Sequence, residues 1–192
     1  AKGKAVPLRL HCIDAAAQAP ALPTLAAPLI GRVSEMATLQ ACLRDALEGR
    51  GTALALVGEA GLGKSRLKHE VARRARAQGA LVHEGRAVAF GGEAYRALAE
   101  VVRGALSLDP RAAPEAARGA LAAAAGGLGL SATDMEHLSH VLGITGPRSP
   151  LRHLDGKTVR QNDLLALRSL VNALGRMKPR VLVLEDLHWA DG

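Results

Sequence analysis

The chain has 192 residues, a formal net charge of +7, 48% hydrophobic residues and only 2% aromatic residues. Such a chain can bury the core of a globular domain, built mainly from leucine, valine and alanine, and its composition excludes intrinsic disorder. The chain has no run of 18 apolar residues, so no membrane-spanning helix is predicted, and no signal peptide is recognised. The arginines are scattered and aromatic stacking residues are nearly absent, so the positive charge does not favour nucleic acid as a partner.

Two features concern the redox compartment of the protein and the extent of the chain. Cys12 and Cys42 have no metal-type spacing, which predicts free, buried thiols in a reducing cytoplasm. The chain begins at Ala1 rather than at a methionine, so we expect it to be part of a larger protein.

The predicted elements begin with a weakly alternating stretch over residues 1–13, which is typical of an edge strand. Residues 14–28 contain three prolines and predict an extended linker, so that the main domain occupies residues 29–192. Ser34 is placed to cap a helix that reaches residue 47. A short apolar strand is expected over residues 52–57.

A helix over 64–78 and a second strand over 80–86 come next, and a right-handed crossover should join the two strands. Three helices are then expected. The first covers residues 93–106, and the second runs from near Pro110, with Pro114 in its first turn, to Ala125. The third is capped by Ser131 and reaches Leu142. A long helix follows, with an apolar stripe of Leu164, Leu165, Leu167, Leu170, Val171 and Leu174, and Pro179 closes it before a strand over 180–184. The fold class is therefore α/β, with a parallel sheet and a helical insert.

The most informative motif is GEAGLGKS at residues 58–65, which fits the phosphate-binding pattern G-x-x-x-x-G-K-[ST]. A predicted strand leads into it and a predicted helix leaves it, so that backbone N–H groups and the positive end of a helix face an anion. The glycines allow the backbone to approach phosphate closely.

A second signal is the apolar run at residues 180–184, which is followed by Glu185 and Asp186. Acids at the carboxyl end of a buried parallel strand lie where open α/β sheets bind their ligands. In a P-loop ATPase the first acid would help to hold Mg²⁺ and the second would polarise the attacking water, which assigns Glu185 to the metal and Asp186 to the water.

With these motifs in view, residues 28–192 resemble the signal-transduction ATPases with numerous domains, which are AAA-like P-loop ATPases close to the origin-recognition type. LIGRVSE at 29–35 resembles the family's hhGRExE box, GEAGLGKSRL at 58–67 its P-loop, and VLVLEDLHWAD at 181–191 its Walker B segment. The chain departs from the family at Val33, where the box often has Glu, and at Glu185, where Asp is commoner. Residues 1–11 resemble the closing strand of a class III nucleotidyl cyclase domain, which implies an attached cyclase upstream.

The resemblance implies a three-layer αβα P-loop fold, ATP and Mg²⁺ as cofactors, and defined roles for site residues. Lys64 and Asp186 would be catalytic, and Ser65 and Glu185 would hold the metal. The nucleotide would be bound by Ile30, Gly31, Arg32, Gly58, Glu59, Ala60, Gly61, Leu62, Gly63, Lys64, Ser65 and Arg66.

Other conspicuous side chains are interpreted as structural. Trp189 is expected to be a packing anchor and His188 a partly exposed loop residue, without a metal. Tyr95 and Phe90 are expected to pack within the helical insert. The basic cluster of Arg66, Lys68, Arg73, Arg74 and Arg76 is interpreted as a solvated helix face.

The family's sheet has a further strand between the P-loop strand and the acid strand, and that strand comes later in sequence. We therefore interpret the chain as a truncated piece that binds ATP, whereas efficient hydrolysis is expected only of the full protein, in which oligomers can form. The leading hypothesis is a nucleotide-controlled regulatory switch. The alternatives are a P-loop kinase, a non-hydrolysing scaffold or interaction module, and an origin-type DNA-loading ATPase.

Overall fold

The computed structural model describes residues 29–88 and 95–189. The chain divides into two units, Ala1–Arg32 and Val33–Gly192, and every helix and strand described belongs to the second. The predicted strand at 1–13, the predicted linker at 14–28, Cys12 and Phe90 lie outside the described residues. The elements are α1 (Val33–Leu47), α2 (Lys64–Ala77), β1 (Leu81–Arg86), α3 (Arg96–Leu106), α4 (Pro114–Gly126), α5 (Ala132–Val141), η1 (Pro150–His153), α6 (Gly156–Met177), β2 (Arg180–Glu185) and η2 (Leu187–Trp189).

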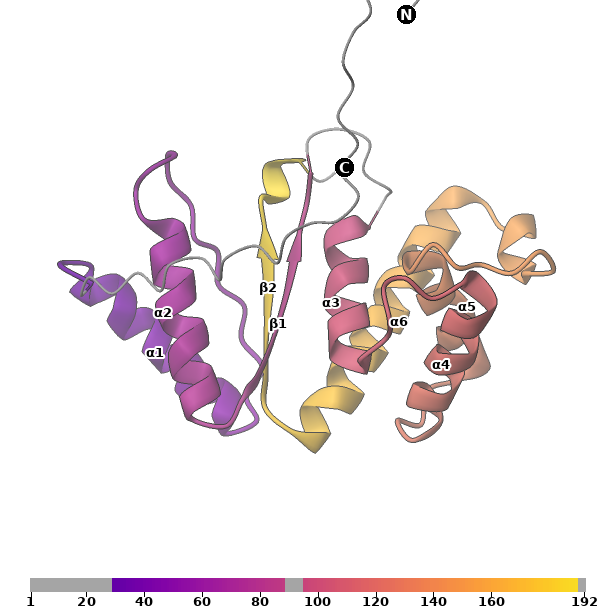
Figure 1. The fold of residues 1–192 in the computed structure, drawn as a ribbon, viewed down its shortest axis with the longest axis horizontal. Helices are drawn as coiled ribbons and strands as arrows, with labels where there is room; N and C mark the ends of the chain where they lie inside the picture. Colours follow the sequence, from indigo (N-terminus) through magenta and orange to yellow (C-terminus); the bar gives the residue numbers. More distant parts are fainter. Residues whose placement is uncertain (1–28, 89–94, 190–192) are drawn as a thin grey trace, which may run out of the picture. The chain divides into compact units, whose positions relative to one another are not determined.

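A two-stranded parallel sheet lies at the centre of the second unit (Figure 1). β1 and β2 pair in register from Leu81 with Arg180 to Arg86 with Glu185. Side chains of a strand alternate between the two faces of the sheet. Val82 and Val181 lie on the face that packs against α1 and α2, where they join a small core around Leu43.

The opposite face of the sheet packs against α3, and a glycine makes this contact close. A Cβ atom on Gly85 would lie 1.9 Å from the carbonyl oxygen of Ala97 in α3. Only glycine therefore fits at this position of β1 without moving the helix. α4, α5 and α6 lie beyond α3 in the same view (Figure 1).

The prediction of a strand over residues 52–57 is wrong. These residues are exposed and belong to no strand, and β1 pairs directly with β2. A strand exists only through its ladder of inter-strand hydrogen bonds. No such partner runs beside residues 52–57 in the described part of the chain, so apolar composition alone does not make them a strand. The crossover predicted between 52–57 and 80–86 does not apply.

Most helices lie where the pattern predicts them, and three starts differ. The helix predicted from residue 93 begins at Arg96, because Tyr95 is its N-cap and has the left-handed φ of 66°. Ser34 does not cap α1, because the helix already begins at Val33 and the Ser34 hydroxyl donates to the Glu35 carboxylate. α4 begins at Pro114 rather than near Pro110, since a residue before proline avoids the helical region and Ala113 has ψ 149°. Ser131 does cap α5, and it forms a reciprocal capping box with Asp134.

The largest core lies among α3, α4, α5 and α6, and it is almost entirely aliphatic. Leu167, Leu170 and Leu174 of α6 are buried in it, but Leu164, Leu165 and Val171 are about half exposed, so the predicted stripe is too wide. α6 packs against α5 along one narrow face, which leaves the flanking positions in solvent. Tyr95 packs against this core, as predicted.

A polar group occupies one position of the buried face of α6. Asp163 is 0% exposed, and its carboxylate accepts hydrogen bonds from Nδ1 of His137 at 2.8 Å and Nδ1 of His140 at 2.9 Å. A carboxylate can only accept, so both imidazoles carry their proton on Nδ1. These bonds tie α5 to α6.

Candidate functional site

The phosphate-binding motif folds into a loop that leads directly into α2. Gly63 is the N-cap of α2 and has φ 83°, in the left-handed region that glycine adopts most readily. Gly61 has the same φ of 83°. Gly63 has no side chain with which to cap the helix, so the first amides of α2 point outward without an intrahelical acceptor. This end of the helix therefore attracts an anion.

Lys64, the first residue of α2, folds back across the loop. Its ammonium donates to the carbonyl oxygens of Gly58 and Glu59, both at 2.7 Å. These bonds connect the beginning of the loop to its end. An arriving phosphate would meet an exposed ammonium held over the loop by two neutral acceptors, which a charged acceptor can displace.

The two acids predicted from sequence follow the sheet as expected. β2 ends at Glu185, and Asp186 has φ 57°, so the chain turns sharply before η2. Asp is among the residues that tolerate this region of backbone space. Glu185 lies in register with Arg86, the last residue of β1.

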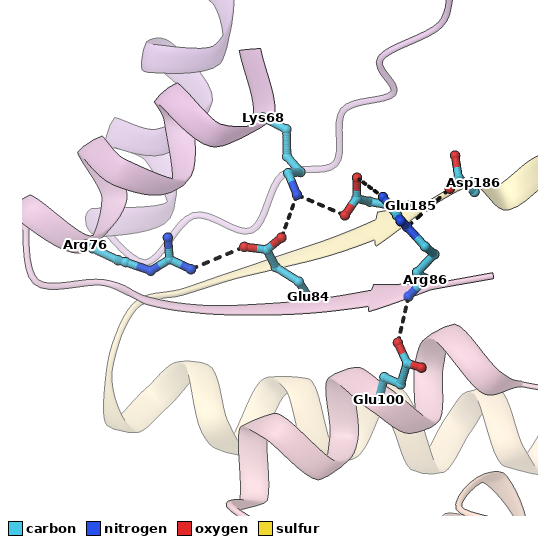
Figure 2. A network of polar contacts seen from close by, with 7 residues as sticks. All are labelled: Lys68, Arg76, Glu84, Arg86, Glu100, Glu185 and Asp186. Carbon is cyan, nitrogen blue, oxygen red and sulfur yellow. Dashed lines mark hydrogen bonds and ion pairs between the residues drawn. The ribbon is translucent and has the colours of Figure 1, made fainter. Parts of the chain in front are cut away.

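Figure 2 shows that Glu185 is the centre of a network of ion pairs. Lys68, one turn into α2, donates to Glu185 at 2.9 Å and to Glu84 of β1 at 2.6 Å. The Lys68 side chain is only 11% exposed and that of Glu185 only 18%. The start of α2 and the carboxyl end of β2 are thus in direct contact.

The pKa values in this network follow from burial and pairing. Burial lowers the pKa of Lys68, but the hydrogen bonds and charges of Glu84 and Glu185 outweigh it and raise the pKa overall. Burial raises the pKa of Glu84, and pairing with Lys68 and Arg76 reverses this and lowers it. Lys68 and Glu84 therefore both carry their charges near neutral pH.

Arg86 is the second cation that holds the acids. Its guanidinium lies 3.5 Å from Glu185 and 3.2 Å from Asp186, and its side chain is 60% exposed. Its backbone N–H donates to the Glu100 carboxylate of α3 at 3.0 Å. Both acids predicted for the site are therefore paired with cations from the protein (Figure 2).

Sequence reasoning missed this network because it treated the basic residues of α2 as one solvated face. That interpretation is wrong for Lys68, which is only 11% exposed and faces the sheet. Arg76 is exposed, as predicted, and its guanidinium lies 3.2 Å from Glu84. Arg73 and Arg74 pair with Glu70 within the helix. A signal was available, since an acid at the end of a strand that faces a lysine-bearing helix needs a buried cation.

The structure brings only some of the predicted residues together. Among the described residues, no hydrogen bond or ion pair joins Lys64 or Ser65 to Glu185 or Asp186. Glu59, Ala60 and Leu62 lie exposed on the loop, and Arg66 lies in the first turn of α2. Ile30, Gly31 and Arg32 belong to the other unit, so their role at a base-binding pocket stays a prediction.

The prediction that Trp189 is a packing anchor is wrong. Its side chain is 48% exposed, and its ring lies at 4.8 Å from that of His188 in a tilted arrangement. His188 is exposed, as predicted.

The donor set fits a nucleotide with its metal. Uncapped amides, the Lys64 ammonium and the Ser65 hydroxyl lie at one helix end, and the Glu185 and Asp186 carboxylates lie at the adjoining strand end. Amides and ammonium suit phosphate, and hydroxyl and carboxylate oxygens suit Mg²⁺, which is bound by few protein ligands together with phosphates and water.

The comparisons with known proteins agree with this geometry. Residues 28–192 match the family described as AAA ATPase domain. The chain belongs to this AAA ATPase family. The AAA ATPase domain is a nucleotide-binding P-loop fold with a three-layer αβα arrangement, and the small parallel sheet flanked by helices is consistent with it.

A curated relative is an uncharacterized protein of Rhizobium meliloti (strain 1021), 31% identical to this AAA ATPase domain over 169 residues. The match covers 85% of the chain but 16% of the relative's length. No solved structure gives a significant match. No helix in the described part of the chain is both long and apolar enough to cross a membrane.

Proposed function

We propose that this AAA ATPase domain is an ATP-dependent switch in a multidomain signalling protein. It would bind ATP with Mg²⁺ and, in the full-length protein, hydrolyse it slowly, so that bound ATP and ADP control an attached output domain. One observation carries the proposal: Lys68 joins the start of α2 to Glu185, so the phosphate-binding loop and the acids lie at one edge of the fold.

Each residue has a specific part in this proposal. The amides from Gly61 to Ser65 and the Lys64 ammonium would hold the phosphates, and Ser65 and Glu185 would hold the metal. Bound Mg²⁺ supplies a bridge between phosphate oxygens and offsets their negative charge. Asp186 would orient the attacking water.

The wider setting rests on two supports. The match covers 16% of the Rhizobium meliloti relative, which supports a domain that works as part of a longer chain. The resemblance of residues 1–11 to the closing strand of a nucleotidyl cyclase supports a cyclase as the attached domain, and a cytoplasmic location follows from that role.

The test is calorimetric titration of the 192-residue chain with Mg-ATP, beside Lys64→Ala. We expect saturable binding by the wild-type chain and no detectable binding by the variant, because the variant lacks the ammonium that would pair with the phosphates. Lys157→Ala, on the exposed first turn of α6, is the matched control and should bind like the wild type. Equal affinity of Lys64→Ala and the wild type would refute the proposed site.

A further inference from the structure

We propose that Lys68 is a positioning residue that withholds Glu185 from the metal, and that Glu84 is the carboxylate that takes over Lys68 when the metal binds. The inference rests on the proposed function, since it concerns the metal that accompanies the nucleotide. It assigns a role to two residues that the phosphate-binding and acid motifs leave out.

The geometry of Lys68 allows such an exchange. An ammonium has three N–H donors, and that of Lys68 uses them on two carboxylates from adjacent parallel strands. The contact with Glu84, at 2.6 Å, is shorter than that with Glu185, at 2.9 Å. Lys68 can therefore give up Glu185 while it keeps a charged acceptor.

Burial makes the second acceptor necessary. With its side chain 11% exposed, Lys68 is largely removed from water, and an unpaired ammonium at such a depth is strongly disfavoured. If Glu185 were its only partner, a metal that bound Glu185 would leave the buried Lys68 ammonium without a charged partner. Glu84 removes that cost because it stays bound to Lys68 throughout the exchange.

The charges of the network show why Lys68 must move. Three cations, Lys68, Arg76 and Arg86, face three carboxylates, Glu84, Glu185 and Asp186. Glu100 is paired with Arg96, so the network is neutral without a metal. A divalent cation on Glu185 would meet the Lys68 ammonium at short range, where repulsion in a partly buried setting is strong. Arg86 is 60% exposed and can turn into solvent, so Lys68 is the cation that controls access to Glu185.

The position of Lys68 on α2 couples the exchange to phosphate binding. Lys68 lies four residues after Lys64, on the same face of the helix and about 6 Å further along its axis. Negative phosphates held at Lys64 would draw the metal to this end of α2. Lys68 would then shift towards Glu84 and away from Glu185.

Two substitutions of opposite effect test the inference. Lys68→Met keeps the apolar stem and removes the charge, so the metal should reach Glu185 without competition. Glu84→Gln removes the second acceptor, so Lys68 should hold Glu185 more firmly. Lys68→Arg keeps the charge and should retain the wild-type Mg²⁺ dependence. Arg73→Gln is the matched control, because it removes an exposed cation that is paired with Glu70 on the same helix.

The measurement is binding of a fluorescent ATP analogue to the whole chain, first in EDTA and then with increasing Mg²⁺. In EDTA we expect all variants to bind the analogue about as tightly as the wild type, because the phosphate-binding loop is untouched. The Mg²⁺ concentration at half-maximal effect should fall about tenfold in Lys68→Met and rise several-fold in Glu84→Gln. Arg73→Gln should match the wild type.

The outcomes separate the two proposals. Binding in EDTA with the same Mg²⁺ dependence in Lys68→Met, Glu84→Gln and the wild type would overturn the inference and leave the proposed function standing. An increased Mg²⁺ requirement in Lys68→Met would overturn it as well, because Lys68 would then assist the metal. No nucleotide binding by the wild-type chain in either buffer would overturn both. If Lys68→Met does not fold, the shift in Glu84→Gln decides.

Discussion

Replacing Gly85 by alanine tests how closely the sheet and α3 are packed. The added methyl group would point from β1 into the backbone of α3, 1.9 Å from the carbonyl oxygen and 2.8 Å from the carbonyl carbon of Ala97. Because these are backbone atoms, no side-chain rotation relieves the contact. β1 and α3 must separate for the variant to fold.

The size of the separation gives the expected cost. A Cβ contact shorter than 3.0 Å is essentially never seen, so the two elements must move apart by about 1.1 Å or more. That movement loosens Val101 and Val102 of α3, which are buried. Overpacking of this kind costs about 1–3 kcal/mol, and a backbone obstacle places Gly85→Ala near the upper value, about 3 kcal/mol. For a chain of this size, that corresponds to a loss of about 6–12 °C in Tm.

Gly104→Ala is the matched control on the same interface. Its Cβ would meet His83 Nδ1 at 3.5 Å, which is ordinary van der Waals contact, and the residue lies within α3. Alanine is a better helix former than glycine, so this variant should gain up to about 1 kcal/mol. The assay is urea and thermal unfolding of both variants beside the wild type. A Gly85→Ala chain within about 0.5 kcal/mol of the wild type would refute the close packing of β1 on α3.

The remaining predictions use the same unfolding assay. Asp163→Asn should lower the free energy of unfolding by about 3 kcal/mol or more, because an amide can no longer accept from two imidazole N–H groups in a buried site. Asp155→Asn, at the N-cap of the same helix, should be nearly neutral, since Asn caps as well as Asp does. Equal losses of stability in the two variants would contradict the role of the buried carboxylate. His83 should make the protein less stable as the pH falls below 6.5: burial, and then the charge of Arg180, lower its pKa, so the unfolded chain binds the proton first. His83→Gln retains an acceptor for the Arg180 guanidinium, so the difference in stability from the wild type should shrink as the pH falls from about 7 to about 5, through the ordinary pKa of histidine. A parallel pH dependence of the two proteins would speak against this assignment.

Much of the candidate site could be predicted because its signals are local. The glycine and lysine spacing at 58–65 fixes a loop that ends in a helix, and α2 begins at Lys64. The apolar run before Glu185 predicts a strand with an acid at its end, and β2 has that form. Each of these needs only a few neighbouring residues to specify it.

The network around Glu185 could not be predicted from the same signals. Lys68 and Glu185 are separated by 117 positions, and only the packing of α2 on the sheet brings them together. The same holds for Asp163, which directly precedes the predicted apolar stripe but pairs with two histidines of another helix. A residue pattern gives the period of an element, but not which partner covers which face.

The sequence by itself determined the family, the helices and the phosphate-binding loop, because hydrophobic period, capping residues and glycine spacing act over one or two turns of chain. Tertiary structure alone decided that residues 52–57 form no strand, since a strand depends on a neighbour with which to share hydrogen bonds. It also decided that Glu185 is paired with Lys68 and Arg86, since the burial of a charge requires an opposite charge that the fold must supply.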